Sequence, residues 1–330
     1  MTGGYDIDEN AVRFSNYLAV LRELVHRSCG HLALEPRFEV KCLLADHLHD
    51  DARAVTEVRA RLDELRDGGP GGPSPELAAL LDRAGSADGT SAYLEIAYGE
   101  LKPTLIAAIR IHLANLDPLA DEPSLRLLTE LLHRQERHAA ELPAERPLVA
   151  IEDLGALPPG EPRALTPAPP IERPARDEFV EVVATAPELD PAAQGRYFHA
   201  LMNAELCAAE VAARTAHEHP ELPWAFHLDM ARRAWDGIRH AEIHDRAMTT
   251  ELGCHWGDHP VSLEAFTAAY ARDLPARLER AEEPPWRDSP VRAALIERGQ
   301  ANLARALDYI HADAARHATG ATPPAGSPPA

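Results

Sequence analysis

Apolar residues recur at spacings of three and four along most of this 330-residue chain, which is the periodicity of amphipathic helices. No segment of the sequence shows the regular alternation that is typical of a strand. The predicted fold class is therefore all-α. In the first half, the pattern predicts helices at 10–34, 37–66, 75–84, 91–117 and 122–141. In the second half, it predicts helices at 176–186, 191–217, 221–252, 261–282 and 289–318.

Proline and glycine mark several ends of these helices. The run GGPGGPSP follows Asp67 and ends the second helix. Pro123 lies in the first turn of its helix, which is a position that proline favours. Pro103 falls inside a predicted helix, so a bend is expected there. Long helices with short connections favour antiparallel four-helix bundles, and we predict two such bundles packed together.

Composition divides the chain into four parts. Residues 1–141 form the predicted N-terminal bundle, and residues 176–318 form the predicted C-terminal bundle. The segment 142–175 between them is rich in proline and has no apolar period, as expected of a connector. Residues 319–330 read TGATPPAGSPPA, a low-complexity composition that is typical of a disordered tail.

Charge and composition narrow the classes of function. The formal net charge is −20, and so acidic a surface repels phosphate groups, which argues against nucleic acid and anionic membranes as partners. The N-terminus lacks the basic and apolar regions of a secretory signal, and no apolar run is long enough to cross a bilayer. The four cysteines are scattered, without Cys-x-x-Cys spacing, which fits reduced thiols. We therefore expect a cytoplasmic protein.

Titratable residues lie in or beside the apolar stripes of three of the long helices in the second half, 191–217, 221–252 and 289–318. A carboxylate inside an apolar stripe has to be paired, protonated or bound to a metal. If these helices form one bundle, the four side chains can converge in its interior. They are Glu205, His240, His244 and His317.

Each of these residues also has a plainer interpretation. A histidine in an apolar stripe is often a hydrogen-bonded core residue, and Glu205 can pair with an arginine such as Arg239. The spacing of His240 and His244 permits chelation, but a solvated helix edge is compatible with it as well. Six further histidines fall mostly at expected helix ends and in loops and are interpreted as surface residues: His199, His217, His219, His227, His255 and His259.

Several strings resemble the ferritin-like superfamily, whose di-iron carboxylate bundles carry Glu-x-x-His ligand pairs. HLDMARRAWDGIRHAEI is similar to the family's second helix, and LDYIHADAARHA to its last helix, where Asp-Glu-x-x-His is expected. NAELCAAEVA resembles the glutamate-bearing helix before them. In the first half, EPRFEVKCLLADHLHDDA and LKPTLIAAIRIHLANLDPLADEPSLRLLTELLHRQERH resemble one uncharacterised group of these proteins. The resemblance covers most of the chain outside the connector and tail, and it implies ferritin-like bundles.

The resemblance also implies a ligand set. It assigns the family's terminal glutamate to Glu205 and its two histidines to His240 and His317. The bridging glutamates correspond to Gly237 and Ala314, so both are missing. For the carboxylate of the remaining helix, Glu264 and Asp273 both stay candidates. The first half shows the same kind of loss, with Gln135 in place of the glutamate before His138.

Loss of the bridging carboxylates changes the chemistry that is expected. Two irons at short separation would repel each other, whereas one glutamate and two histidines suit a single Fe(II) with open positions. Glycine and alanine would leave space for a substrate where the bridging side chains stood. We therefore expect a ferritin-like metalloenzyme with mononuclear iron, a non-haem iron-type oxidoreductase that oxidises a small organic substrate, with His244 as a reserve ligand.

Two other functions stay open. One is a metal-free ferritin-like enzyme in which Glu205 and a histidine act as base and acid in the vacated cavity. The other is a noncatalytic scaffold or partner protein that inherited the fold. In each case the N-terminal bundle is expected to be structural, and a homodimer is left open. The alanine- and arginine-rich composition suggests a high-GC bacterial genome, where specialised metabolism is one setting for such an enzyme.

Overall fold

The computed structural model describes residues 4–65, 72–161, 163–165, 191–259, 261–278 and 290–320. Within these residues the protein is all-α and contains no strand, which confirms the predicted fold class. The predicted helix at 176–186 and nearly all of the predicted tail lie outside the described residues. No helix in the described part of the chain combines the length and the apolar character that crossing a bilayer requires.

The chain divides into two compact units. The first unit comprises Met1–Ala175 and Ala212–Trp235, and the second comprises Arg176–Val211 and Asp236–Ala330. The boundaries fall within two long helices, α7 (Pro191–Glu218) and α8 (Trp224–Leu252). The first unit therefore includes the end of α7, the start of α8 and the turn that joins them.

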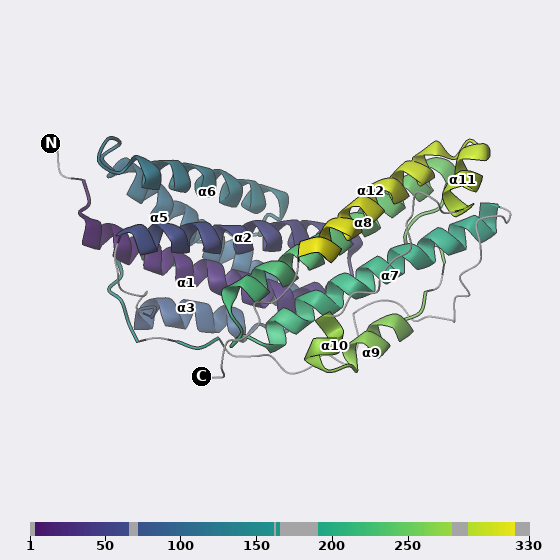
Figure 1. The fold of residues 1–330 in the computed structure, drawn as a ribbon. Coiled ribbons are helices and arrows are strands. Elements are labelled where there is room, and N and C mark those ends of the chain that lie inside the picture. Colours follow the sequence, from purple (N-terminus) through teal and green to yellow (C-terminus); the bar gives the residue numbers. More distant parts are fainter. Residues whose placement is uncertain are drawn as a thin grey trace. The chain divides into compact units, whose positions relative to one another are not determined.

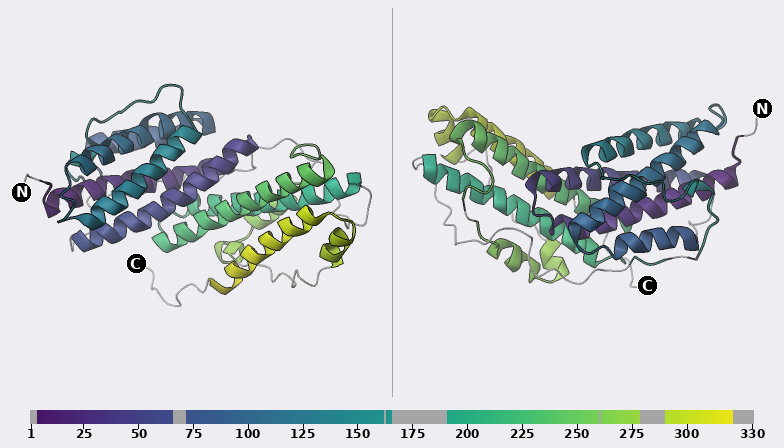
Figure 2. Two further views of the ribbon diagram at one scale, coloured as in Figure 1. Left: turned by 90° about the horizontal axis from the view of Figure 1, so that it is seen from above. Right: turned by 180° about the vertical axis from the view of Figure 1, so that it is seen from behind.

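Four long helices make up most of the first unit. α1 lies along α2, and α5 lies along α6 (Figures 1 and 2). Their facing stripes bury leucine, valine and aromatic side chains, among them Phe14, Leu21, Leu44 and Leu48. The helices are α1 (Ile7–Leu32), α2 (Phe38–Leu65), α5 (Lys102–Ala114) and α6 (Glu122–Glu141), with the shorter α3 (Pro75–Gly85) and α4 (Gly89–Ile96) between α2 and α5.

Side-chain caps fix where several of these helices begin. At α1, the Glu9 amide donates to the Asp6 side chain at 2.8 Å, and the Asp6 amide donates to the Glu9 side chain at 2.9 Å. This reciprocal pair satisfies two amides that a helix start leaves without partners. Ser74 caps α3 by accepting from the Leu77 amide.

The predicted helix at 91–117 is interrupted by a π-helical turn, η1 (Ala97–Leu101). Pro103 has no amide hydrogen, so it cannot donate to the Gly99 carbonyl one turn earlier. That carbonyl instead accepts a hydrogen bond of 2.6 Å from the Leu148 amide. The expected disturbance near the proline thus takes the form of a wider turn before it, and such turns are frequent at functional sites.

In the second unit, two predicted helices are each broken into two. The segment 261–282 contains α9 (Glu264–Tyr270) and α10 (Leu274–Leu278), and the Asp273 side chain accepts from the Ala276 amide at the start of α10. The segment 289–318 contains α11 (Pro290–Glu297) and α12 (Ala301–Gly320). Gly299 lies between them with φ of +76°, a conformation that glycine adopts at low cost and that ends a helix.

Candidate functional site

Three helices of the second unit bring a histidine between two carboxylates. His240 on α8 is 4% exposed, and its Nδ1 lies 3.2 Å from the Glu205 Oε2 on α7. Its Nε2 lies 3.5 Å from the Asp313 Oδ2 on α12. Arg239, the preceding residue, forms ion pairs with Asp313 and with Asp236. Asp313 therefore contacts both a histidine and an arginine of α8, which fixes the carboxylate.

The charge of the Glu205 carboxylate controls the titration of His240. Burial alone would lower the pKa of this imidazole. The hydrogen bond and the charge of Glu205, helped by Asp313, outweigh that effect and raise the pKa above its ordinary value. The arrangement therefore favours a cation between Glu205 and Asp313.

His244 lies one turn further along α8 and has a different environment. Its side chain is 2% exposed, and its Nδ1 is fully buried with no hydrogen-bond partner among the described residues. Burial, followed by the charges of His240 and His311, lowers its pKa to about 3. His244 is therefore a neutral imidazole near His240, with a ring nitrogen that no described residue satisfies.

These residues have the chemistry of a metal site, although their donors are not already gathered around one point. Two ligands at about 2.1 Å from one ion are themselves about 3.0–3.4 Å apart, which matches the 3.2 Å between His240 and Glu205. A hydrogen bond accounts for the same distance. His317, the third predicted ligand, belongs to α12, but its side chain lies outside the described residues.

Gly237 does not leave the cavity that was expected from the sequence. A Cβ atom at this position would lie 3.0 Å from the Ala209 Cβ and 3.0 Å from the Glu205 carbonyl oxygen. Glycine here lets α8 approach the α7 backbone closely, so the helices themselves occupy the space. The expectation of a vacated pocket at this position is wrong, because even a Cβ atom there would be in tight contact with α7.

Several histidines that were interpreted as surface residues are buried, so that interpretation is wrong for them. His217 is stacked on His26 at 4.3 Å and donates from Nδ1 to the His26 carbonyl at 2.6 Å. His199 accepts from the Gly257 amide at 2.9 Å and is stacked on Trp256. His227 is also buried. A position near a helix end does not make these histidines exposed, because neighbouring segments cover them.

The first unit has its own buried polar centre, and the sequence had pointed to Gln135 and His138 but not to the lysine at its middle. Lys102 is 1% exposed, and its ammonium donates to Asp51 at 2.8 Å, to Gln135 at 2.8 Å and to His138 Nδ1 at 3.1 Å. Gln135 in turn donates to Asp51 at 2.6 Å. All three hydrogens of the ammonium thus have acceptors. Gln135 and His138, the residues at which the sequence indicated a lost metal site, are therefore hydrogen-bonded to a lysine.

A second group in the first unit has metal-ligand chemistry. Among the described residues, only Asp46, His47 and Glu141 place three such donor atoms within 4.8 Å of one another. Arg137 already contacts both carboxylates of this group, at 2.8 Å and 2.9 Å. His47 is held by the Tyr98 hydroxyl at 2.7 Å. A metal ion would have to compete with the arginine, so this group is a weaker candidate than the cluster around His244.

Comparison of the chain with protein-family models, with curated protein sequences and with solved structures gave no match. The resemblance to the ferritin-like superfamily therefore stays a prediction from the sequence motifs.

Proposed function

We propose that the second unit is a ferritin-like metalloenzyme domain in which Glu205, His240 and His244 would hold one iron ion, and that the domain oxidises a small organic molecule with dioxygen as the oxidant. The observation that carries this proposal is His244. A buried polar group without a hydrogen-bond partner destabilises a protein by about 1–3 kcal/mol. A metal ion bound to the His244 ring nitrogen would remove this cost. Two imidazoles and a carboxylate form the donor set that suits Fe(II) with open positions.

The surrounding residues fix the orientation of His240 and leave Glu205 partly exposed. Asp313 contacts the second ring nitrogen of His240, and Arg239 holds Asp313, so the imidazole has a fixed orientation. The Glu205 side chain is 28% exposed, compared with 6% for His240. A substrate would therefore approach from the side of Glu205. An iron ion bound here would supply the redox chemistry.

A second candidate function follows from the two carboxylates around His240. An imidazolium held between Glu205 and Asp313 carries a proton that it can transfer to a substrate, with Glu205 as the partner base. Such a site would perform acid–base chemistry without metal. His244 has no role in this alternative, and that is why we rank it second.

Metal analysis of the full chain, purified without chelator, tests the proposal. We expect about one iron per chain in the natural protein, and loss of most of it in Glu205→Ala/His240→Ala and in His244→Ala. His255→Ala is the matched control, because His255 is exposed and its variant should keep the metal. Circular dichroism should show the same helix content in all four proteins.

Three outcomes would contradict the proposal. Negligible metal in the natural protein, even after anaerobic Fe(II) titration, would favour acid–base chemistry if substrates turn over, and a scaffold if they do not. Two irons per chain in that titration would contradict a mononuclear centre. Equal metal in the natural protein and the His244→Ala variant would remove the observation on which the proposal rests.

A further inference from the structure

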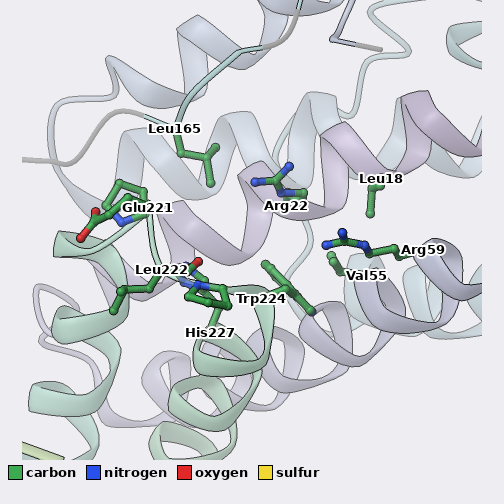
Figure 3. A pocket seen from close by; sticks show the side chains of 11 residues that line it. Leu18, Arg22, Val55, Arg59, Leu165, Glu221, Leu222, Trp224 and His227 are labelled. Atoms are coloured by element: carbon green, nitrogen blue, oxygen red, sulfur yellow. The ribbon is translucent and has the colours of Figure 1, made fainter. Parts of the chain in front are cut away.

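A pocket of about 260 Å³ lies within the first unit, and the residues that line it belong to neither the Lys102 centre nor the His240 cluster (Figure 3). It is formed by α1, α2, the turn before α8 and the first residues of α8. The lining residues that determine its chemistry are Leu18, Arg22, Val55, Arg59, Trp224 and His227. The pocket thus combines two cationic side chains with apolar and aromatic walls.

The two arginines are the unusual part of this pocket. Figure 3 shows Arg22 of α1 and Arg59 of α2 at the same pocket, and the two are close enough for Arg59 to act electrostatically on Arg22. Within the described part of the chain, neither guanidinium forms an ion pair or a hydrogen bond, although most of the other arginines there do. The neighbouring carboxylate of Glu23 is bound to Arg27 at 2.7 Å. Two like charges therefore share a pocket without a counter-ion from these residues.

Electrostatics also favour an anion at this position. Burial, and then repulsion from Arg59, lowers the pKa of Arg22 below its ordinary value. α8 begins at Trp224, so the positive end of its helix dipole lies at the pocket. The one carboxylate of the lining, Glu221, contacts His219 at 3.1 Å. A bound anion would relieve the repulsion between the arginines.

The other residues that line the pocket determine which kind of molecule can carry the anionic group. Leu18 and Val55 provide an aliphatic surface. The Trp224 indole is held in place, because its Nε1 donates to the Thr56 hydroxyl at 3.1 Å and its ring is stacked on His227. A fixed aromatic face beside aliphatic groups binds a flat apolar group better than a hydrated inorganic ion.

We propose that this pocket binds a small organic carboxylate with a flat apolar body, with Arg22 and Arg59 on the carboxylate and Trp224 against the body. The site is independent of the proposed function, since it uses no residue of the iron cluster. Its occupancy and the metal content of the second unit can therefore fail separately.

Isothermal titration of the full chain with sodium benzoate tests the site, and benzamide and inorganic phosphate serve as comparison probes. Benzoate should bind, and benzamide, which has the same shape without the charge, should bind about tenfold more weakly or worse. Arg22→Gln and Arg59→Gln should each weaken benzoate binding by about tenfold. Arg126→Gln is the matched control, because Arg126 is exposed and paired with Glu122, and it should bind as the natural protein does.

Absence of benzoate binding at concentrations up to about 10 mM would overturn the proposal. Equal benzoate binding in Arg59→Gln and the natural protein would do the same, and this variant should fold because Arg59 is exposed. Phosphate that binds as tightly as benzoate would contradict the role of Trp224. Iron content measured on the same samples should not change in any of these variants.

Discussion

Replacing Lys102 with methionine is the most direct test of the buried centre in the first unit. The substitution keeps an unbranched side chain of similar length and removes only the ammonium. Asp51, whose side chain is 3% exposed, would then keep a buried charge with Gln135 as its remaining hydrogen-bond partner at this centre. The acceptors on Gln135 and His138 would also lose their donor.

The expected loss is large relative to the stability of a domain. Removing one partner of a buried ion pair costs about 3–5 kcal/mol, because the other charge stays buried without compensation. Domains are stable by about 5–15 kcal/mol, so Lys102→Met should remove a substantial part of the stability of the first unit. Adding Asp51→Asn removes the uncompensated charge, and the double variant should recover about 1–3 kcal/mol.

Urea unfolding followed by far-ultraviolet circular dichroism gives these free energies. Arg126→Gln serves as the control and should leave the free energy of unfolding nearly unchanged, since its ion pair is exposed. A loss below about 1 kcal/mol in Lys102→Met would show that the ammonium does not stabilise this centre. A double variant no more stable than the single one would refute the assignment of the penalty to Asp51.

Three further predictions follow from individual residues. Burial, with added repulsion from Arg13, lowers the pKa of His112 to about 3, so the unfolded chain binds the extra proton and stability should fall as pH drops from about 6.5 toward 3. Urea titrations at several pH values should show a shallower slope in His112→Gln. Gly237→Ala should destabilise the second unit by up to about 2 kcal/mol, because overpacking costs about 1–3 kcal/mol and the higher helix propensity of alanine offsets about 1 kcal/mol of it. Gly237→Glu should destabilise the unit further, and thermal melting measures both variants. Ser74→Ala removes the cap of α3 and should cost about 1 kcal/mol in urea, whereas an unchanged value would exclude a stabilising cap.

Helix prediction succeeded where the pattern of apolar residues and the end signals agreed. The helix at 122–141 has the predicted bounds, because Asp121 caps it and Pro123 fits its first turn. The predicted helix bounds were wrong where the helical spacing of apolar residues continued past a residue that ends a helix. Asp273 and Gly299 both end or begin helices, and both are visible in the sequence, but the surrounding periodicity favoured continuous helices.

The candidate sites were harder to predict for a physical reason. Periodicity gives the face of a helix on which a residue lies, and it was enough to select Glu205 and His240, whose side chains lie 3.2 Å apart. It does not give the partner across the interface, so Asp313 was missed. Lys102 was missed because lysine is almost always exposed in folded proteins. Its burial is possible here because Asp51 and Gln135, which lie on other helices, accept hydrogen bonds from its ammonium.

The π-turn at 97–101 determines which way the second half of that helical segment faces. Tyr98 and Lys102 are both buried, and the lysine ammonium lies 5.4 Å from the centre of the tyrosine ring. Were the same residues wound as an uninterrupted α-helix, everything after the turn would be rotated by about 100° about the axis. The ammonium would then point away from Asp51. One additional residue in a single turn thus directs the Lys102 ammonium toward Asp51, Gln135 and His138.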